Sequence, residues 1–328
     1  SAGKTLLSEA LLVCGGGLNR LGSVAHGTTV SDYHDNERER KISIQTSLLH
    51  LDWEGRKLNL MDCPGSLDFI TEALGALRVA DVAVVVVDAR DGVGVGTLQV
   101  WDWATQFGLP KVLVVNGLDQ ENVDGEQVLA QLRQSFGERV LPLSVALNPG
   151  PGLTQVLDVP RQAVLTYAAD RSGKFTEAAA SGAAAEQARA GHEKLVESVA
   201  EADDALMEKF FEQGTLSEAE WRGGLRRALQ QQTLIPVFAT SAEKNVGVAQ
   251  VLEFLAQYAP SPADRPAVPA QDAQGTEGTL ELTSPDPVLY VFKTLSEAKF
   301  GEVSFFRVYA GTLTVGIELN NPGRRATE

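Results

Sequence analysis

The sequence predicts an α/β fold with a doubly wound, mostly parallel sheet, and two kinds of segment carry this prediction. Residues 82–87 and 111–115 are uninterrupted apolar runs rich in valine, which is typical of strands buried on both faces of a sheet. Residues 67–79 and 98–107, which precede these runs, have the apolar spacing of helices. Strands that alternate with helices favour a parallel sheet, because each helix supplies the crossover between neighbouring strands.

The remaining elements of this first domain, residues 1–258, follow from shorter patterns. Residues 46–53 and 57–61 have strand composition and are joined by a Glu-Gly pair, which predicts a hairpin. Residues 31–41 are polar and charged, and we expect them to lie outside the core. The other expected elements are a helix over 6–12, a buried strand over 234–238 and a closing helix over 248–258.

An inserted α+β subdomain is predicted at about residues 140–233, where the pattern changes. Residues 140–158 are β-like and rich in glycine and proline. Residues 176–191 are alanine-rich and of low complexity, which predicts a mobile loop or a frayed helix. Two further helices are expected over 192–211 and 217–230.

A second domain is expected to begin after a linker. Residues 259–287 combine several prolines with small polar residues, which is typical of a linker. Residues 288–328 alternate apolar and polar side chains between turn glycines, which predicts the start of an antiparallel β-barrel domain.

Composition and charge exclude several classes of function. The chain has 328 residues, and its 28 basic and 43 acidic residues give a net charge of −15, so we expect no free DNA binding. The longest apolar run falls far short of the roughly 20 residues that cross a membrane. The two cysteines, Cys14 and Cys63, cannot build a disulfide framework. We therefore expect a cytoplasmic, monomeric protein without a membrane partner or a secretion signal.

We expect this sequence to be a piece of a longer protein, because of how it begins and how it stops. The chain opens on Ser1 without a methionine and stops within the expected barrel. We expect a further strand before Ser1, at the centre of the sheet, between the strands that end near Met61 and Val87.

The first motif with chemical meaning is the run Ala2, Gly3, Lys4 and Thr5, at the start of a predicted helix. It matches the second half of a phosphate-binding loop, G-x-x-x-x-G-K-[ST]. In such a loop the backbone N–H groups cradle a phosphate, the lysine neutralises it and the hydroxyl binds Mg²⁺. The motif is weak by itself, because its leading glycine would precede Ser1.

The second motif, D-x-x-G, lies between a strand and a helix and contains Asp62 and Gly65. A carboxylate at this place can hold Mg²⁺ through water, and the glycine N–H can contact a γ-phosphate. A plain strand-to-helix turn is the alternative interpretation.

The third and fourth motifs follow two buried strands and point to a base. Asn116 and Asp119 have the spacing of an N-K-x-D loop, in which the aspartate accepts two hydrogen bonds from guanine and rejects adenine. Ser241 and Ala242 follow the strand 234–238, where a backbone N–H would contact the guanine oxygen. Ordinary turns are again the alternative, because Asn, Gly and Asp are common in turns.

The four motifs together are a stronger signal than any one of them. Each is expected at the carboxyl end of a strand, which is the edge where open α/β sheets bind ligands. The sequence therefore predicts a site for GTP or GDP. The residues expected to bind GTP are Ala2, Gly3, Lys4, Thr5, Asp62, Gly65, Asn116, Asp119, Ser241 and Ala242.

Longer runs around these motifs match one family. They are the run 62–65 with Phe69, and the runs 38–44, 201–209, 259–264 and 305–313. On these runs the chain resembles elongation factor G, a translational GTPase, over essentially its whole length. The resemblance implies a P-loop GTPase domain with an insertion between the third and fourth motifs, then a barrel and three further domains.

The same resemblance implies ligands and partners. It implies GTP or GDP with Mg²⁺ as cofactor, the metal being held by Thr5 and Ser43. The implied partner is the ribosome, through its RNA and proteins. Members of the family move transfer RNA and messenger RNA through the ribosome, or separate its subunits, under GTP control.

Four positions depart from the family pattern. Ser66 stands where the family has a histidine that positions the attacking water, so hydrolysis of GTP is expected to be impaired. Gly117 replaces a lysine whose stem covers the guanine ring, which predicts an affinity about tenfold lower and tighter binding by Gly117→Lys. Ser43 replaces a threonine and keeps its hydroxyl, and Lys41 replaces a glycine.

Three functions stay open on the sequence. The first is an enzyme that hydrolyses GTP on the ribosome, and the second is a GTP-dependent ribosome-binding module with little turnover. Ser66 and Gly117 favour the second function. The third is a relative such as a ribosomal-protection protein or a release factor.

Overall fold

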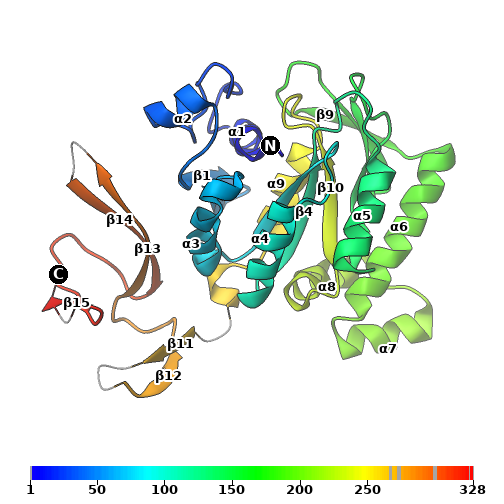
Figure 1. Cartoon of the computed structure of the whole chain (residues 1–328). Coiled ribbons are helices and arrows are strands. Elements are labelled where there is room, and N and C mark those ends of the chain that lie inside the picture. Colours follow the sequence, from blue (N-terminus) through cyan, green and yellow to red (C-terminus); the bar gives the residue numbers. More distant parts are fainter. Residues whose placement is uncertain (1, 266–267, 272–274, 298–300, 325, 328) are drawn as a thin grey trace. The chain divides into compact units, whose positions relative to one another are not determined.

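The chain forms two compact units, Ser1–Ala259 and Pro260–Glu328 (Figure 1). The computed structural model describes residues 2–265, 268–271, 275–297, 301–324 and 326–327. Among these residues, no helix is long and apolar enough to cross a membrane.

The first unit is built on a parallel four-stranded sheet with the strand order β3-β4-β10-β5. The strands are β3 (Ala83–Asp88), β4 (Lys111–Asn116), β10 (Ile235–Thr240) and β5 (Val140–Pro142). Every residue of β4 and β10 is buried. This sheet confirms the predicted α/β fold.

Helices pack on both faces of this sheet, as a doubly wound fold requires. Val112 and Val114 of β4 point into one core, which includes residues of α1 (Lys4–Cys14) and α9 (Val248–Tyr258). Leu113 and Val115 point into the opposite core, which includes residues of α5 (Gly125–Phe136), a helix that the sequence reading did not predict. The other helices between β2 and β4 are the short η1 (Leu67–Phe69), α3 (Thr71–Val79) and α4 (Val95–Gln106).

The predicted hairpin is present as β1 (Ser47–Trp53) and β2 (Arg56–Asp62), which pair antiparallel. Glu54 and Gly55 both have positive φ, 49° and 75°, which gives the turn whose twist matches a two-residue hairpin. Among the described residues, β1 and β2 form a sheet of their own. The strand expected before Ser1 stays a prediction.

The polar segment before this hairpin differs from the expectation. It contains the short helix α2 (Asp35–Arg40), and Ser31, Asp32 and Glu37 are buried. The expectation that the whole segment lies outside the core was therefore wrong. These three polar side chains are buried because they contact the candidate site described below.

The segment between β5 and β10 contains an antiparallel sheet and three helices. The sheet has the order β6-β7-β8-β9, with β6 (Ser144–Ala146), β7 (Gln155–Asp158), β8 (Ala163–Tyr167) and β9 (Phe175–Ala179). The helices are α6 (Gly182–Ala200), α7 (Asp204–Gln213) and α8 (Glu218–Gln231). β5 belongs to the main sheet, although the sequence placed residues from about 140 in the insertion.

Of the two alternatives for residues 176–191, a mobile loop or a frayed helix, the structure has a helix over 182–191. This is the first half of α6, whose Ala188 is fully buried, and the end of β9 precedes it. The helix expected over 192–211 is interrupted, because Asp203 caps the start of α7 by accepting from the N–H groups of Ala205 and Leu206 at 2.9 and 3.2 Å.

The second unit contains antiparallel strand pairs. The pairs are β11 (Val268–Gln271) with β12 (Glu277–Leu280), β13 (Val288–Glu297) with β14 (Gly301–Ala310), and β15 (Asn320–Asn321) with β16 (Ala326–Thr327). Antiparallel strands after the α/β domain were predicted. The first pair and the short η2 (Pro262–Asp264) lie in the segment expected to be a linker.

Candidate nucleotide site

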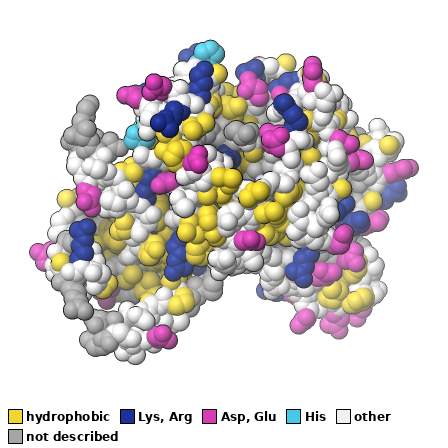
Figure 2. Space-filling view, in the orientation of Figure 1, with side chains coloured by type: hydrophobic (Ala, Val, Ile, Leu, Met, Phe, Trp, Pro, Cys, Tyr) yellow, Lys and Arg dark blue, Asp and Glu magenta, His cyan; other side chains and the backbone are white. Residues whose placement is uncertain are grey.

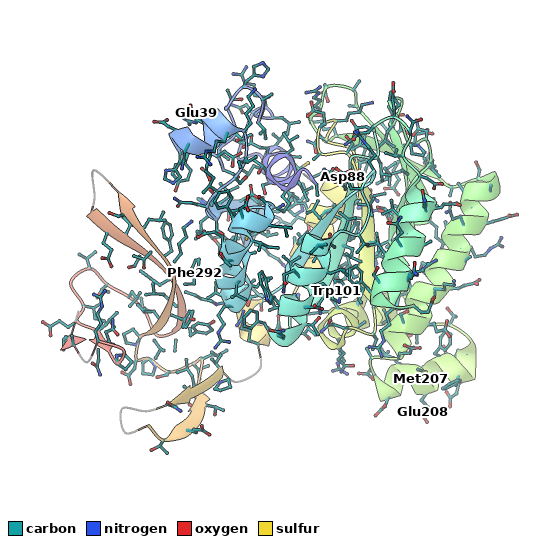
Figure 3. All side chains as sticks on the ribbon, in the orientation of Figure 1. Glu39, Asp88, Trp101, Met207, Glu208 and Phe292 are labelled. Carbon is teal, nitrogen blue, oxygen red and sulfur yellow. The ribbon has the colours of Figure 1, made fainter. Side chains whose placement is uncertain are left out.

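The third and fourth motifs and the start of α1 meet at one edge of the main sheet. Asn116 is the last residue of β4, and its partners in the neighbouring strands are Asp88, the last residue of β3, and Thr240, the last residue of β10. Figure 3 shows Asp88 at this edge, beside the end of the sheet at which α1 begins. The carboxyl ends of the parallel strands thus place these loops together, as predicted.

The side chain of Asn116 joins three of these loops. Its Nδ2 donates to the carbonyl of Ala2 at 3.0 Å. Its Oδ1 accepts from the N–H of Ala242 at 2.8 Å and from the hydroxyl of Thr240 at 3.2 Å. One buried amide therefore holds the phosphate-loop residues, the β4 loop and the β10 loop in register, and this role was not foreseen from the sequence.

The loop after β10 is closed by its own hydrogen bonds. Ser241 and Val246 exchange two backbone hydrogen bonds of 2.9 Å, and Ser241 Oγ accepts from the N–H of Lys244 at 3.0 Å. Because the Ala242 N–H already donates to Asn116, a contact between this group and a guanine oxygen would have to share that hydrogen.

The phosphate side of the site is formed by Gly3, Lys4 and Gly65. Gly3 caps the start of α1 in a left-handed conformation, and Lys4 opens the helix. The Lys4 ammonium lies against Gly65, in the space that a Cβ atom at position 65 would fill, so a larger residue there would displace the lysine. Burial lowers the pKa of Lys4 from its ordinary value, an effect that the nearby Asp62 carboxylate opposes.

Two hydroxyls and a carboxylate gather beside Lys4. The hydroxyls of Thr5 and Ser43 lie 3.1 Å apart, although 38 residues separate them in the chain. Asp62 is 5% exposed, and burial raises its pKa to about 6, against the opposing effects of the Ser31 hydroxyl and the Lys4 ammonium. These groups come from α1, from the segment after α2 and from the end of β2.

This cluster fits a hard cation such as Mg²⁺. Asp62 Oδ2 is buried and, among the described residues, has no hydrogen-bond partner. The charge of Asp32, a second buried carboxylate, raises the pKa of Asp62 further. Carboxylate and hydroxyl oxygens are the ligands that Mg²⁺ uses in nucleotide sites. In the described part of the chain, no group of three or more His, Cys, Asp or Glu side chains could hold a metal, so such a cation would need hydroxyl, water or phosphate ligands as well.

Two buried glutamates that the sequence reading missed hold the segment around this cluster. Glu9 of α1 accepts from the N–H groups of Gly22 and Val30 at 2.8 and 2.6 Å. Glu37 of α2 accepts from the N–H groups of Ile44 and Gln45 at 2.8 and 3.0 Å, directly after Ser43. Glu37 lies in a charged run, which normally indicates a solvated surface, so only the fold reveals its contacts.

The side chain of Ser66 is hydrogen-bonded to Asp68. It is the N-cap of η1, and its hydroxyl both accepts from the N–H of Asp68 and lies 3.4 Å from the Asp68 carboxylate. The serine side chain is therefore turned toward the start of η1, one residue beyond the Gly65 that contacts Lys4.

The base side of the site contains Gly117, Asp119 and Gln120. Gly117 has a φ of 84°, in the left-handed region. Asp119 and Gln120 line an open cleft of about 500 Å³ together with Arg90, Glu121, Asn122 and Pro151. The Asp119 carboxylate is thus placed at a hollow of the surface next to the loop that Asn116 anchors.

An exposed apolar patch lies next to the D-x-x-G segment. In Figure 2, hydrophobic side chains gather over α3 and α4. Next to the D-x-x-G segment, Leu67 of η1 and Val95 of α4 are 58% and 71% exposed, and Leu74 of α3 and Leu98 of α4 are exposed as well. Exposed apolar patches of this kind mark surfaces that contact a partner or another domain.

Comparison with known proteins identifies the family. The family model of the elongation factor Tu GTP binding domain matches residues 1–261, a range that contains all four motifs. A protein from Thermus thermophilus with a crystal structure is similar to this chain, at 31% sequence identity and a TM-score of 0.85 over 98% of this chain. This chain spans 45% of that protein. The match confirms the predicted resemblance, and the chain belongs to the translational GTPases that share the elongation factor Tu GTP-binding domain.

Proposed function

We propose that this chain is the GTP-operated part of a translation factor of the elongation factor G type that acts on the ribosome. The observation that carries the proposal is the Asn116 side chain, which joins three nucleotide-binding motifs through hydrogen bonds of 2.8 to 3.2 Å. A buried amide that bonds to two other loops fixes the relative positions of the three loops at the sheet edge where open α/β folds bind ligands.

The residues divide into three roles at this edge. The start of α1 and the Lys4 ammonium would bind the phosphates, with the Gly65 N–H facing the last phosphate. Asp119 would accept from the guanine edge, with the loop of Ser241 and Ala242 beside it. Thr5, Ser43 and Asp62 would hold Mg²⁺, directly or through water.

Magnesium, when bound, would neutralise charge on the phosphate oxygens during phosphoryl transfer. The side chains of the protein would contribute by their charge and by their placement around the phosphates. A bound phosphate would raise the pKa of Lys4 again, because an anion opposes the burial that lowers it. Glu37 would hold Ser43 in place through the two N–H groups that follow it.

Hydrolysis is proposed to be slow. The hydroxyl of Ser66 is engaged at the N-cap of η1 and is too short to orient a water at the phosphate. Groups that position water or transfer protons are worth about 10²–10⁴-fold in rate. This observation favours the second candidate function, a ribosome-binding module with little turnover, and the exposed patch at Leu67 and Val95 would supply part of a contact surface.

Multiple-turnover GTP hydrolysis with and without ribosomes tests this proposal. We expect weak ribosome stimulation for the natural protein and a gain of at least about tenfold for Ser66→His. Ser66→Ala is the matched control, because it removes the cap without adding an imidazole. Strong ribosome stimulation of the natural protein, with no gain from histidine, would show that another residue supplies this function.

A further inference from the structure

The loop after β4 contains Gly117, and the side-chain amide of Gln120 fills the space next to this glycine. Gly117 lies between Asn116 and Asp119 with a φ of 84°. A Cβ atom built on Gly117 would lie 2.5 Å from Gln120 Nε2 and 3.3 Å from Gln120 Cδ. Contacts under 3 Å are far inside the van der Waals distance, so the amide of Gln120 occupies the space in which a side chain at position 117 would start.

Gln120 is held in this place by the turn itself. Its backbone N–H donates to the carbonyl of Gly117 at 3.1 Å, which folds residue 120 back over residue 117. Its side chain lines the same cleft as Asp119. Its Oε1 is buried and, within the described ranges, accepts no hydrogen bond, although a buried amide oxygen normally does.

We propose that the side-chain amide of Gln120 forms one wall of the base site and packs against the purine face of the bound guanine nucleotide. The inference rests on the proposed function, because it needs a nucleotide in this loop. An amide plane offers a flat contact to a purine ring, and the Nε2 of Gln120 lies on the Gly117 side of the loop. Gly117 and Gln120 form a matched pair, since the Gln120 amide fills the space that a side chain at position 117 would need.

This proposal reverses the expectation drawn from the sequence alone for Gly117→Lys. In the natural background a lysine would meet the Gln120 amide, and it would also be strained at a positive φ. We therefore expect Gly117→Lys to weaken GDP binding in the natural protein. In a Gln120→Ala background the same substitution should weaken binding less, because the contact with the amide is removed and only the backbone strain remains.

Titration of the full chain with a fluorescent GDP analogue, followed by competition with GDP and IDP, tests the proposal. We expect Gln120→Ala to lower the affinity for GDP and IDP by the same factor, about five- to tenfold. IDP lacks the exocyclic amine that Asp119 would read, so Asp119→Ala should instead abolish the preference for GDP over IDP. If Gln120 only supported the position of Asp119, Gln120→Ala would change that preference as well.

Matched controls separate the outcomes. Gln127 of α5 is exposed and does not line this cleft, so Gln127→Ala should leave both affinities within about twofold. Thermal unfolding of each variant reports folding, and Gln120→Asn keeps an amide but shortens it, so it should lose affinity without losing stability. An unchanged GDP affinity in Gln120→Ala, or additive effects of the two substitutions, would overturn the inference. Absence of guanine-nucleotide binding by the natural protein would overturn the proposed function instead.

Discussion

Replacing Asp62 by asparagine should make the metal-free, nucleotide-free protein more stable at neutral pH. Burial raises the pKa of Asp62 from 3.8 to about 6, so folding favours its protonated form. A group of this kind contributes most stability below its ordinary pKa, and that contribution is lost as the pH rises through about 6. At pH 8 the ionised carboxylate is then held in the fold at a cost.

The magnitude follows from the size of the shift. One pKa unit corresponds to about 1.4 kcal/mol, so the cost at pH 8 has an upper bound of about 3 kcal/mol. Asparagine has the same shape and no charge, and we expect Asp62→Asn to raise the free energy of unfolding by about 1–3 kcal/mol at pH 8 and by little at pH 4. The same variant should bind GTP more weakly in Mg²⁺, because it loses a carboxylate ligand.

Urea denaturation with a chelator, at pH 4, 6 and 8, measures this effect. Asp52 of β1 is exposed, so Asp52→Asn is the matched control and should change the unfolding free energy by less than about 0.5 kcal/mol. A lower stability of Asp62→Asn at pH 8 would contradict this prediction, because it would mean that the ionised carboxylate stabilises the empty fold.

Two further substitutions test the surroundings of the site. Glu37→Ala removes the acceptor of the N–H groups after Ser43, so the affinity for GTP should fall about tenfold in Mg²⁺ and change little with a chelator. The control is Glu39→Ala, an exposed residue of the same helix (Figure 3), which should leave both titrations unchanged. Lys111 is buried at the start of β4, and its ammonium donates to the carbonyl of Leu109 at 3.2 Å and to the side-chain oxygen of Gln232 at 2.5 Å. Lys111→Met should therefore lower the unfolding free energy at pH 7 by about 1 kcal/mol, because both acceptors lose their donor. A gain of stability at pH 7 in urea denaturation would contradict this.

The main sheet could be predicted because its strands are nearly uniform in chemistry. Residues of β4 and β10 are buried on both faces, so their side chains form continuous apolar runs that short-range reading detects. β9 gave no such signal, since four of its five residues are exposed and its backbone pairing with β8 leaves no trace in the sequence pattern. Helix α6 was obscured for a related reason, because its alanine-rich first half shows little contrast between its faces.

The motifs predicted which residues belong to the candidate site, but the sequence could not predict the hydrogen bonds that fix their positions. Asn116 was expected as part of a base-reading loop, and its hydrogen bonds to Ala2 and Ala242 cross more than 100 residues of chain. Glu37 lies in a charged run that looks solvated, and its burial depends on the packing of the whole segment. Gln120 belongs to no motif, and only the geometry around Gly117 reveals its position.

Calorimetric titration of the natural protein with GTP, GDP and ATP in Mg²⁺ shows whether this site binds guanine nucleotides selectively. The site joined by Asn116, with Asp119 at the base side, predicts that GTP and GDP bind and that ATP binds at least about 100-fold more weakly. Asp119→Ala should remove most of this difference, while Asn116→Ala should weaken all three nucleotides because the loops lose their common anchor. Binding of ATP as tight as that of GTP, or no binding of either, would contradict the account.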